Sequence, residues 1–323
     1  MKKKIITITG AAGNIAYSLI FRILSGDIFE RNTKIQLNLL DITTALPILL
    51  GVKLEIEDCA FTQLDDVIIT DDPEIAFADS DFVLLVGAKP RTKGMQRADL
   101  LLDNASIFQK QAKIINDKAK NSTKIIVVGN PANTNALIIQ KNAKNIESKN
   151  ISSLMRLDQN RAKSILSAKT NCKVENIQQL IVWGNHSATQ YPDISNCTIN
   201  NSNDDILSLD PRWISDDFIP RVQNRGAEII EHRGKSSAAS AASAIYDHLN
   251  TIVNGSSDWE SMGIMTENKY DIDDEIFFSY PLSINKDKIN IIDNIELNTS
   301  SIEYIKKSEK ELLSERDIIK DLL

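Results

Sequence analysis

Cysteine, histidine and long apolar runs are all scarce in this sequence, and each scarcity excludes a class of protein. The 323 residues include three cysteines, Cys59, Cys172 and Cys197, which are widely spaced and form no CxxC pair. We therefore expect a reducing, cytoplasmic setting with neither a disulfide framework nor a metal site. No apolar run approaches membrane-spanning length. The N-terminal lysines precede an apolar run of only four residues, 5–8, which is too short for the core of a signal peptide.

Positively charged residues are also fewer than negatively charged ones, so the formal net charge at pH 7 is -7. That balance argues against a nucleic-acid-binding surface. Apolar residues make up 42% of the chain and charged residues 25%, which is the composition of an ordinary globular protein with a substantial core. The length predicts two domains or one large one. The expected partner is a small molecule rather than a nucleic acid or a membrane.

Strand-like and helix-like segments alternate through the first half of the chain. The pattern predicts strands over 4–9, 35–40, 67–70, 81–86 and 124–128, with helices over 17–24, 48–64, 73–78 and 99–119. Such alternation is typical of an α/β fold with a doubly wound parallel sheet. After residue 150 the pattern changes, and it predicts helices over 159–170, 216–231, 233–253 and from 301, a surface hairpin over 195–205 and strands over 275–280 and 289–292. We therefore predict a Rossmann domain over 1–150 and an α+β substrate domain over 151–323.

The first strand runs directly into a glycine turn and then a helix. The turn has the form G-x-x-G-x-x-A, with Gly10, Gly13 and Ala16 at the small positions. Small residues let the backbone approach a pyrophosphate, and a helix N-terminus favours its negative charge. Asp41, at the end of the second strand, can accept hydrogen bonds from a ribose and repel a 2′-phosphate, which favours NAD over NADP. The alternative is a tight turn and an ordinary turn aspartate that bind no ligand.

Only three histidines are present, and His186 is the one that follows a buried strand end. It is placed for proton transfer near neutral pH. Asp158 and Arg161 lie three residues apart, so on one face of a helix they would be neighbours. An aspartate that fixes an imidazole, a histidine that moves a proton and an arginine that holds a carboxylate would form a hydroxy-acid site. The alternative is a structural histidine at a turn.

Two further segments lie beyond the carboxyl ends of predicted strands, where ligands bind in open α/β sheets. The loop 89–97 carries Arg91 and Arg97 between Pro90 and turn residues, which suits a segment that closes on an anion. The alternative is a solvated basic loop. Asn130 follows the strand at 124–128, and the proline after it permits a cis peptide bond.

Six motifs in order make the chain resemble the malate dehydrogenases of the cytosolic type, in the lactate/malate dehydrogenase superfamily. They are TGAAGNIAYSL, GAKPRTKGMQRADLL, VVGNPANTNAL, RLDQNRAKS, WGNHSATQYPD and RGKSSAASAA. The resemblance implies reversible hydride transfer between malate and oxaloacetate with NAD, a step of the tricarboxylic acid cycle, carried out by a homodimer.

The resemblance also implies a role for individual residues. His186 would be the proton donor and acceptor, and Asp158 would pair with it. Arg161 would hold the C1 carboxylate, Arg91 the distal carboxylate, and Arg97 would polarise the carbonyl. Asn130 and Ser240 would contact the substrate. The NAD site would be lined by Gly10, Ala11, Ala12, Gly13, Asn14, Ile15, Ala16, Asp41, Asn104, Gln111, Val128, Gly129 and Asn130.

Two positions depart from the cytosolic pattern. Asn14 stands where Gln is frequent, so its side chain is one methylene shorter. Lys89 adds a charge beside Arg91, as in the NADP-using plastid branch, but Asp41 argues against NADP because it would meet the 2′-phosphate directly.

Three other functions compete with this one. A lactate dehydrogenase would have an uncharged residue at the position that Arg91 occupies here. A short-chain dehydrogenase or epimerase would place a lysine four residues after a tyrosine, a spacing that this sequence does not contain. A Rossmann protein that binds NAD without catalysis would not need the full set of Asp158, His186 and arginines.

Overall fold

The fold is a mixed α/β structure organised around one long sheet, and the computed structural model describes residues 2–90, 97–273, 275–286 and 288–323, with the exception of the Arg97 side chain. The N-terminal half contributes six strands and five main helices. These are β1 (Lys3–Thr9), α1 (Asn14–Ser25), β2 (Lys34–Leu40), α2 (Leu46–Asp58), β3 (Leu64–Thr70), α3 (Pro73–Phe77), β4 (Phe82–Leu85), α4 (Arg97–Lys118), β5 (Lys124–Val127), α5 (Ala132–Asn142) and β6 (Ile151–Leu154). Neighbouring strands in this half pair in parallel, in the order β3-β2-β1-β4-β5-β6. This is the strand order of the dinucleotide-binding Rossmann fold, so the predicted doubly wound sheet is confirmed.

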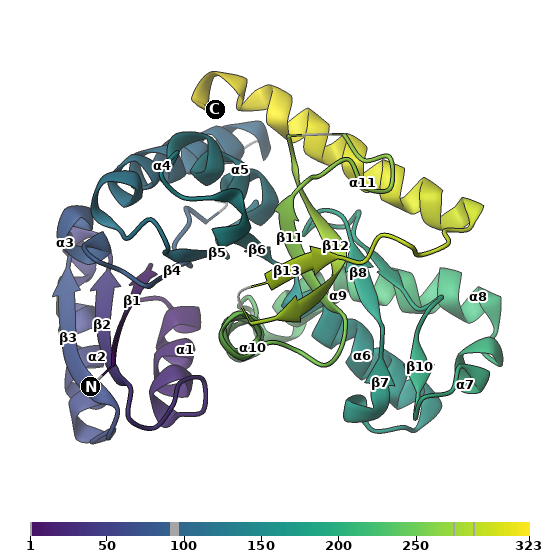
Figure 1. The fold of residues 1–323 in the computed structure, drawn as a ribbon, viewed down its shortest axis with the longest axis horizontal. Coiled ribbons are helices and arrows are strands. Elements are labelled where there is room, and N and C mark those ends of the chain that lie inside the picture. Colours follow the sequence, from purple (N-terminus) through teal and green to yellow (C-terminus); the bar gives the residue numbers. More distant parts are fainter. Residues whose placement is uncertain (1, 91–96, 274, 287) are drawn as a thin grey trace.

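The C-terminal half extends the same sheet and adds its own layers. Its elements are α6 (Arg156–Thr170), β7 (Ile177–Gln178), β8 (Ile181–Trp183), β9 (Tyr191–Asp193), β10 (Thr198–Ile199), α7 (Asp204–Leu207), α8 (Pro211–Trp213), a π-helical turn η4 (Ile214–Phe218), α9 (Ile219–Arg233), α10 (Ala239–Asn254), β11 (Glu260–Met265), β12 (Phe277–Asn285), β13 (Lys288–Ile291) and α11 (Thr299–Ile318). Strands β11, β12 and β13 join β6 in antiparallel pairing, so the described sheet has nine strands. In Figure 1 the Rossmann strands and the C-terminal strands form one continuous layer, with α11 passing over its upper edge. The proposed boundary at residue 150 therefore falls within a single sheet.

Two apolar cores lie on opposite faces of the Rossmann strands. Along β4, Leu84 joins the core beneath α1, α6 and α10, whereas Val83 and Leu85 join the core beneath α3, α4 and α5. Strand β5 alternates in the same way. This follows from the period of two along a strand, which sends successive side chains to opposite faces. Burial on both faces fixes the sheet between two helical layers and aligns the strand ends at one edge.

The helix expected over 48–64 ends earlier than predicted, because α2 stops at Asp58 and β3 begins at Leu64. The helix expected from 233 begins at Ala239 instead. In the expected hairpin over 195–205, Ile199 bridges to Ser202, but β10 takes its main pairing from β7. The pattern also gave no indication of α5, β6 or β11. Among the described residues, every helix is too short or too polar to cross a membrane.

His248 on α10 lies wholly buried beside β6, and its Nε2 is 2.9 Å from the Ser152 hydroxyl. Burial, followed by the charge of Arg156, lowers the pKa of His248 to about 3, whereas its usual value is 6.5. Between those two pH values the unfolded chain binds the proton and the folded chain does not. This residue therefore makes folding less favourable as pH falls below 6.5, by up to about 1.4 kcal/mol per pH unit.

The free energy of unfolding of the wild type should fall between pH 7 and pH 5.5. In His248→Gln we expect this fall to be smaller by roughly 1 kcal/mol. Urea titrations of both proteins at the two pH values measure it. The matched control is His232→Gln, because His232 is exposed on α9, and this variant should keep the wild-type dependence. An unchanged dependence in His248→Gln would contradict the assignment.

Candidate active site

Strands β1, β4 and β5 end side by side, and the backbones that leave them pass very close together. A Cβ atom placed on Gly10 would lie 2.5 Å from the Cα of Gly87, and one placed on Gly129 would lie 2.9 Å from the Ala88 Cβ. Gly10 also has a positive φ of 62°. Larger residues would force these strand ends apart, so the glycines create the shallow floor on which a ligand can lie.

Helix α1 begins at this floor with its amide groups open. Its N-cap is Gly13, which provides no side-chain cap, and its first turn carries no acidic residue. The first N–H groups of a helix have no intrahelical acceptor, so here they are free to meet a phosphate. Asn14 is exposed at the start of the helix, while Ala11 and Ala16 are buried against the sheet.

Asp41 lies at the end of β2 and faces this glycine turn. Its carboxylate accepts hydrogen bonds from the backbone N–H of Ala12 (2.9 Å) and of Ile42 (2.8 Å). These two bonds fix the carboxylate at the rim of a cavity of about 710 Å³, which Gly10, Gly87 and Gln111 also line. The Gln111 Oε1 is buried and lacks a hydrogen-bond partner within the described residues. An open, largely apolar cavity between a glycine turn and a fixed acid fits the adenosine half of a dinucleotide.

Asn104 and Lys89 have structural contacts at this rim. Asn104 is fully buried, and its amide accepts from the backbone N–H of Lys89 (2.7 Å) and donates to the Lys89 carbonyl (3.2 Å). The Lys89 ammonium pairs with Asp103 at 2.6 Å. Asn104 thus fixes the chain where it leaves the strand end, and the extra charge of Lys89 is directed to a neighbouring acid.

The second half of the site is built on α6 and on the segment after β8. Asp158, wholly buried on α6, accepts a hydrogen bond at its Oδ2 from the Nδ1 of His186. Its Oδ1 accepts from the Nη1 of Arg161 (3.1 Å). When its amide nitrogen faces the carboxylate, Gln190 donates to both oxygens at 3.2 Å. The carboxylate is therefore saturated with donors, and the imidazole is fixed in orientation.

The electrostatics of this pair favour its charged form. Burial raises the pKa of Asp158, but the charges of His186 and Arg161 and the His186 hydrogen bond outweigh it, so the net pKa is lowered. Burial lowers the pKa of His186, but the charge and hydrogen bond of Asp158 outweigh it, so the net pKa is raised. His186 can thus hold a proton above its usual pH range, and because Nδ1 is engaged, Nε2 is the nitrogen that can exchange it.

Arg161 is also held on a second side. Its Nη2 donates to the Ser237 hydroxyl at 3.2 Å, and its Nε is buried with no partner among the described residues. A buried guanidinium N–H without an acceptor costs free energy unless a ligand supplies one. A carboxylate is the ligand that this planar fork fits best.

His186 opens into a cavity of about 360 Å³ that Asn130, Pro131, Ser187 and Leu101 also line. The Asn130–Pro131 bond is cis, as the sequence allows. Asn130 is exposed, while Val128 and Gly129 behind it donate their N–H groups to the Leu85 carbonyl (3.0 and 2.9 Å). The strand end thus carries Asn130 to the same cavity as the histidine.

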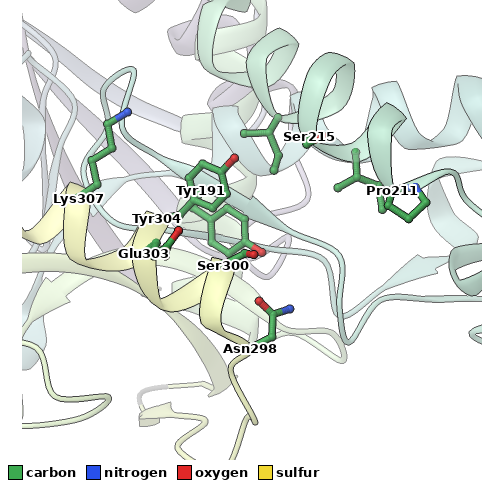
Figure 2. Close-up of a pocket in the computed structure, with 10 residues that line it drawn as sticks. Tyr191, Pro211, Ser215, Asn298, Ser300, Glu303, Tyr304 and Lys307 are labelled. Atoms are coloured by element: carbon green, nitrogen blue, oxygen red, sulfur yellow. The ribbon is translucent and has the colours of Figure 1, made fainter.

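A larger hollow of about 560 Å³ lies elsewhere, between η4 and the start of α11. Figure 2 shows Tyr191 and Tyr304 at its centre, with Lys307 and Glu303 on α11 at one side. The rings of Tyr191 and Tyr304 stack with their centroids 4.8 Å apart. None of the candidate site residues lines this hollow. We therefore do not assign it as the active site, although it is larger than the cavity at His186. Within the described part of the chain, no group of His, Cys, Asp and Glu side chains could hold a metal ion.

The described structure does not place every predicted site residue in the candidate active site. Arg91 falls outside the described residues, and so does the Arg97 side chain, although Arg97 begins α4. Ser240 is exposed in the first turn of α10 and stays a prediction, whereas Ser237 contacts Arg161.

The sequence pattern gave no role to Ser237, Gln190 or Asn133. Asn133 is buried, and its Oδ1 accepts from the N–H of His186 at 3.1 Å. An amide or hydroxyl gives no periodic signal, so position within the quoted motifs was the only available indication.

Comparison with known proteins matches both halves of the chain. A model of the lactate/malate dehydrogenase NAD binding domain matches residues 4–152, and one of the lactate/malate dehydrogenase alpha/beta C-terminal domain matches residues 155–322. The structure of a malate dehydrogenase from Naegleria fowleri is similar at 41% identity and a TM-score of 0.96, covering 100% of this chain and 99% of that one.

A lactate dehydrogenase of Trichomonas vaginalis, in complex with NADH and oxamate, is similar at 35% identity and a TM-score of 0.94, covering 99% of this chain and 98% of that one. A malate dehydrogenase of Plasmodium falciparum, at 20% identity and a TM-score of 0.84 over 100% of this chain and 99% of that one, shares the fold.

Proposed function

The chain belongs to the lactate/malate dehydrogenase family and uses NAD as its cofactor, and we propose that its substrate pair is malate and oxaloacetate. Membership supports an NAD-dependent dehydrogenase of 2-hydroxy acids. Because similar structures include both a malate and a lactate dehydrogenase, membership leaves the substrate open. The observation that carries the proposal is the presence of Arg91 in the segment GAKPRTKGMQR. In sequence, Arg91 directly follows Pro90, which lines the cavity that contains Asp41. A positive charge at this position suits a second carboxylate.

The residues of the site have distinct tasks in this proposal. Arg161 binds the C1 carboxylate through the part of its fork that faces away from Asp158. His186 donates its Nε2 proton to the substrate oxygen during reduction and removes it during oxidation, and Asp158 stabilises the charged ring. Arg97 is proposed to polarise the carbonyl and Arg91 to bind the distal carboxylate. NADH, when bound, supplies the hydride.

Initial rates of NADH oxidation with oxaloacetate, pyruvate and, as a cofactor control, NADPH test this function. We expect fast turnover with oxaloacetate and NADH, and far slower turnover in the other combinations. Comparable rates with pyruvate would contradict the proposed substrate. Binding of NADH without turnover of any 2-oxo acid would contradict catalysis itself.

We expect Arg91→Gln to reduce kcat/KM for oxaloacetate by roughly 30-fold or more, because removing one partner of a buried charge pair costs about 2–5 kcal/mol. Pyruvate has a methyl group in place of the distal carboxylate, so its kcat/KM should change little. The measured quantity is the ratio of the two kcat/KM values. Lys93→Gln, which removes a charge from the same segment, is the matched control. An unchanged ratio in Arg91→Gln would show that another residue sets specificity.

We expect Asp41→Gly to weaken NADH binding by about tenfold or more, since hydrogen bonds to a charged group contribute about 1.5–3 kcal/mol. Its preference for NADH over NADPH should narrow, because a 2′-phosphate would no longer meet a fixed carboxylate. Fluorescence titrations with both cofactors measure this. Asp71→Asn removes a charge from the same cavity lining and serves as control. If the NADH/NADPH ratio did not move, the ribose contact would be assigned to the wrong residue.

A homodimer and a cytoplasmic location remain proposals that rest on the resemblance. Helix α2 supports the first, because it exposes Ile48, Leu50 and Leu54 on its surface. Exposed apolar side chains gathered on one element are typical of subunit interfaces. Equilibrium sedimentation tests the proposal, and a monomer at micromolar concentration would contradict it.

A further inference from the structure

Two glutamates of the last helix line the same cavity as His186. Helix α11 packs against α5 and β9, far along the chain from the Rossmann strands (Figure 1). Glu311 and Glu315 are four residues apart, so they lie on one face of that helix. Glu315 is 5% exposed and Glu311 is half-buried. Buried carboxylates are unfavourable unless donors surround them, so their contacts indicate what they do.

Glu311 binds the residues that flank His186 in sequence. Its Oε2 accepts from the Asn185 Nδ2 (3.1 Å), from the Thr189 hydroxyl (2.6 Å) and from the Ser187 hydroxyl. An ionised carboxylate only accepts hydrogen bonds, so it orients all three donors toward one point. The residue before His186 and the residue after it are therefore tied to the same atom of α11.

Glu315 binds the other segment that holds His186. It accepts from the Thr134 hydroxyl, and its second oxygen is 3.4 Å from the Asn185 Nδ2. Thr134 follows Asn133, whose Oδ1 accepts the N–H of His186 itself. The two glutamates thus join the His186 segment to the start of α5 through side-chain bonds.

The His186 segment has little regular structure of its own. Residues 185–190 lie between β8 and β9 and are neither helix nor strand. Asn185 donates its backbone N–H to the Ser308 hydroxyl at 2.8 Å, again on α11. A loop without a strand partner keeps its shape through such bonds. The ring of His186 must meet Asp158 at Nδ1 and the substrate at Nε2, and a displacement of about 1 Å can cost two orders of magnitude in rate.

We propose that Glu311 and Glu315 are positioning residues that hold the main chain of His186 in the geometry required for proton transfer. The inference rests on the proposed function, since it names residues that act through the proposed proton donor. The C-terminal helix is therefore part of the catalytic apparatus, and its two carboxylates act through the segment that carries His186.

The test compares Glu311→Ala with Glu311→Gln in the full-length enzyme. We expect Glu311→Ala to lower kcat for oxaloacetate reduction by about tenfold to a hundredfold, with NADH affinity within twofold of wild type. Glu311→Gln keeps one acceptor oxygen and should retain more of the activity. Glu303→Ala is the matched control, because Glu303 is exposed on the same helix, and its kcat should equal that of wild type.

A spectroscopic measurement separates positioning from general stability. The chain has only three histidines, so the imidazole N–H signals can be assigned by NMR. The proton shared by His186 Nδ1 and Asp158 should give a strongly downfield signal, and Glu311→Ala should shift or broaden it. Glu303→Ala should leave it unchanged.

Each outcome decides the inference. A folded Glu311→Ala enzyme with wild-type kcat and an unchanged His186 signal would overturn it, and so would a change confined to KM. If Glu311→Ala did not fold, Ser187→Ala removes one of the same bonds and is expected to lower kcat in the same direction. If the wild type reduced no 2-oxo acid, the proposed function would fail, while the His186 signal in Glu311→Ala would still decide the positioning role.

Discussion

Replacement of His186 with glutamine is expected to lower kcat for oxaloacetate reduction by about two to four orders of magnitude, the usual contribution of general acid–base catalysis. The glutamine amide can bind Asp158 but cannot give up a proton to an alkoxide. NADH binding should stay near wild type, because His186 does not line the cavity that contains Asp41. Steady-state rates together with a fluorescence titration of NADH measure both quantities.

The pH dependence gives the same prediction a second test. The pKa of His186 is raised by Asp158, so the protonated ring persists above the usual histidine range. Reduction, which needs the proton, should decline as pH rises through the raised pKa, and malate oxidation should increase over the same window. In His186→Gln neither the decline of reduction nor the increase of oxidation with pH should be present. A variant that kept the wild-type profile would show that another group carries the proton.

Arg161→Gln is expected to lower kcat/KM by roughly 30-fold to several thousand-fold, corresponding to about 2–5 kcal/mol for the loss of one partner of a buried charge pair. Its guanidinium lies between Asp158 and Ser237, and its side chain is 13% exposed. The buried Nε identifies it as the group that lacks an acceptor until a carboxylate arrives.

Arg161→Lys separates charge from geometry, because lysine keeps the charge but loses the planar fork. We expect it to recover only part of the lost kcat/KM. Lys163→Gln is the control on the same helix, since Lys163 pairs with Asp258 at 2.6 Å and lies outside the cavity lining. A wild-type kcat/KM in Arg161→Gln would remove Arg161 from substrate binding.

Predictions from sequence succeeded where a local pattern carries the information. Alternating strands and helices predicted the parallel sheet, and the glycine turn that begins at Gly10 lies at a cavity, as a ligand-binding turn would. The pair Asp158 and Arg161 followed from helical spacing. That Asp158 pairs with His186, 28 positions away, was an implication of the quoted motifs, and in the structure the two side chains are hydrogen-bonded.

Elements without a clear period were not predictable in this way. Strand β6 contains Ser152 and Ser153 at buried positions, so its composition resembles a loop. Strand β11 contains Gly263, whose position against Ser153 leaves little room for a side chain. Both are strands because neighbouring strands supply their hydrogen bonds, and that pairing is not visible within either segment.

The sequence by itself determined the Rossmann alternation, the glycine turn, the acid at the end of β2 and the motifs that contain the candidate catalytic residues, because each depends on neighbours within a few residues. Only the tertiary structure decided that β11 to β13 continue the same sheet, that Ser237 and Gln190 complete the shell around Arg161 and Asp158, and that Glu311 binds Asn185 across 126 positions. These contacts depend on how distant elements pack, and side-chain hydrogen bonds across such separations leave no periodicity in the sequence.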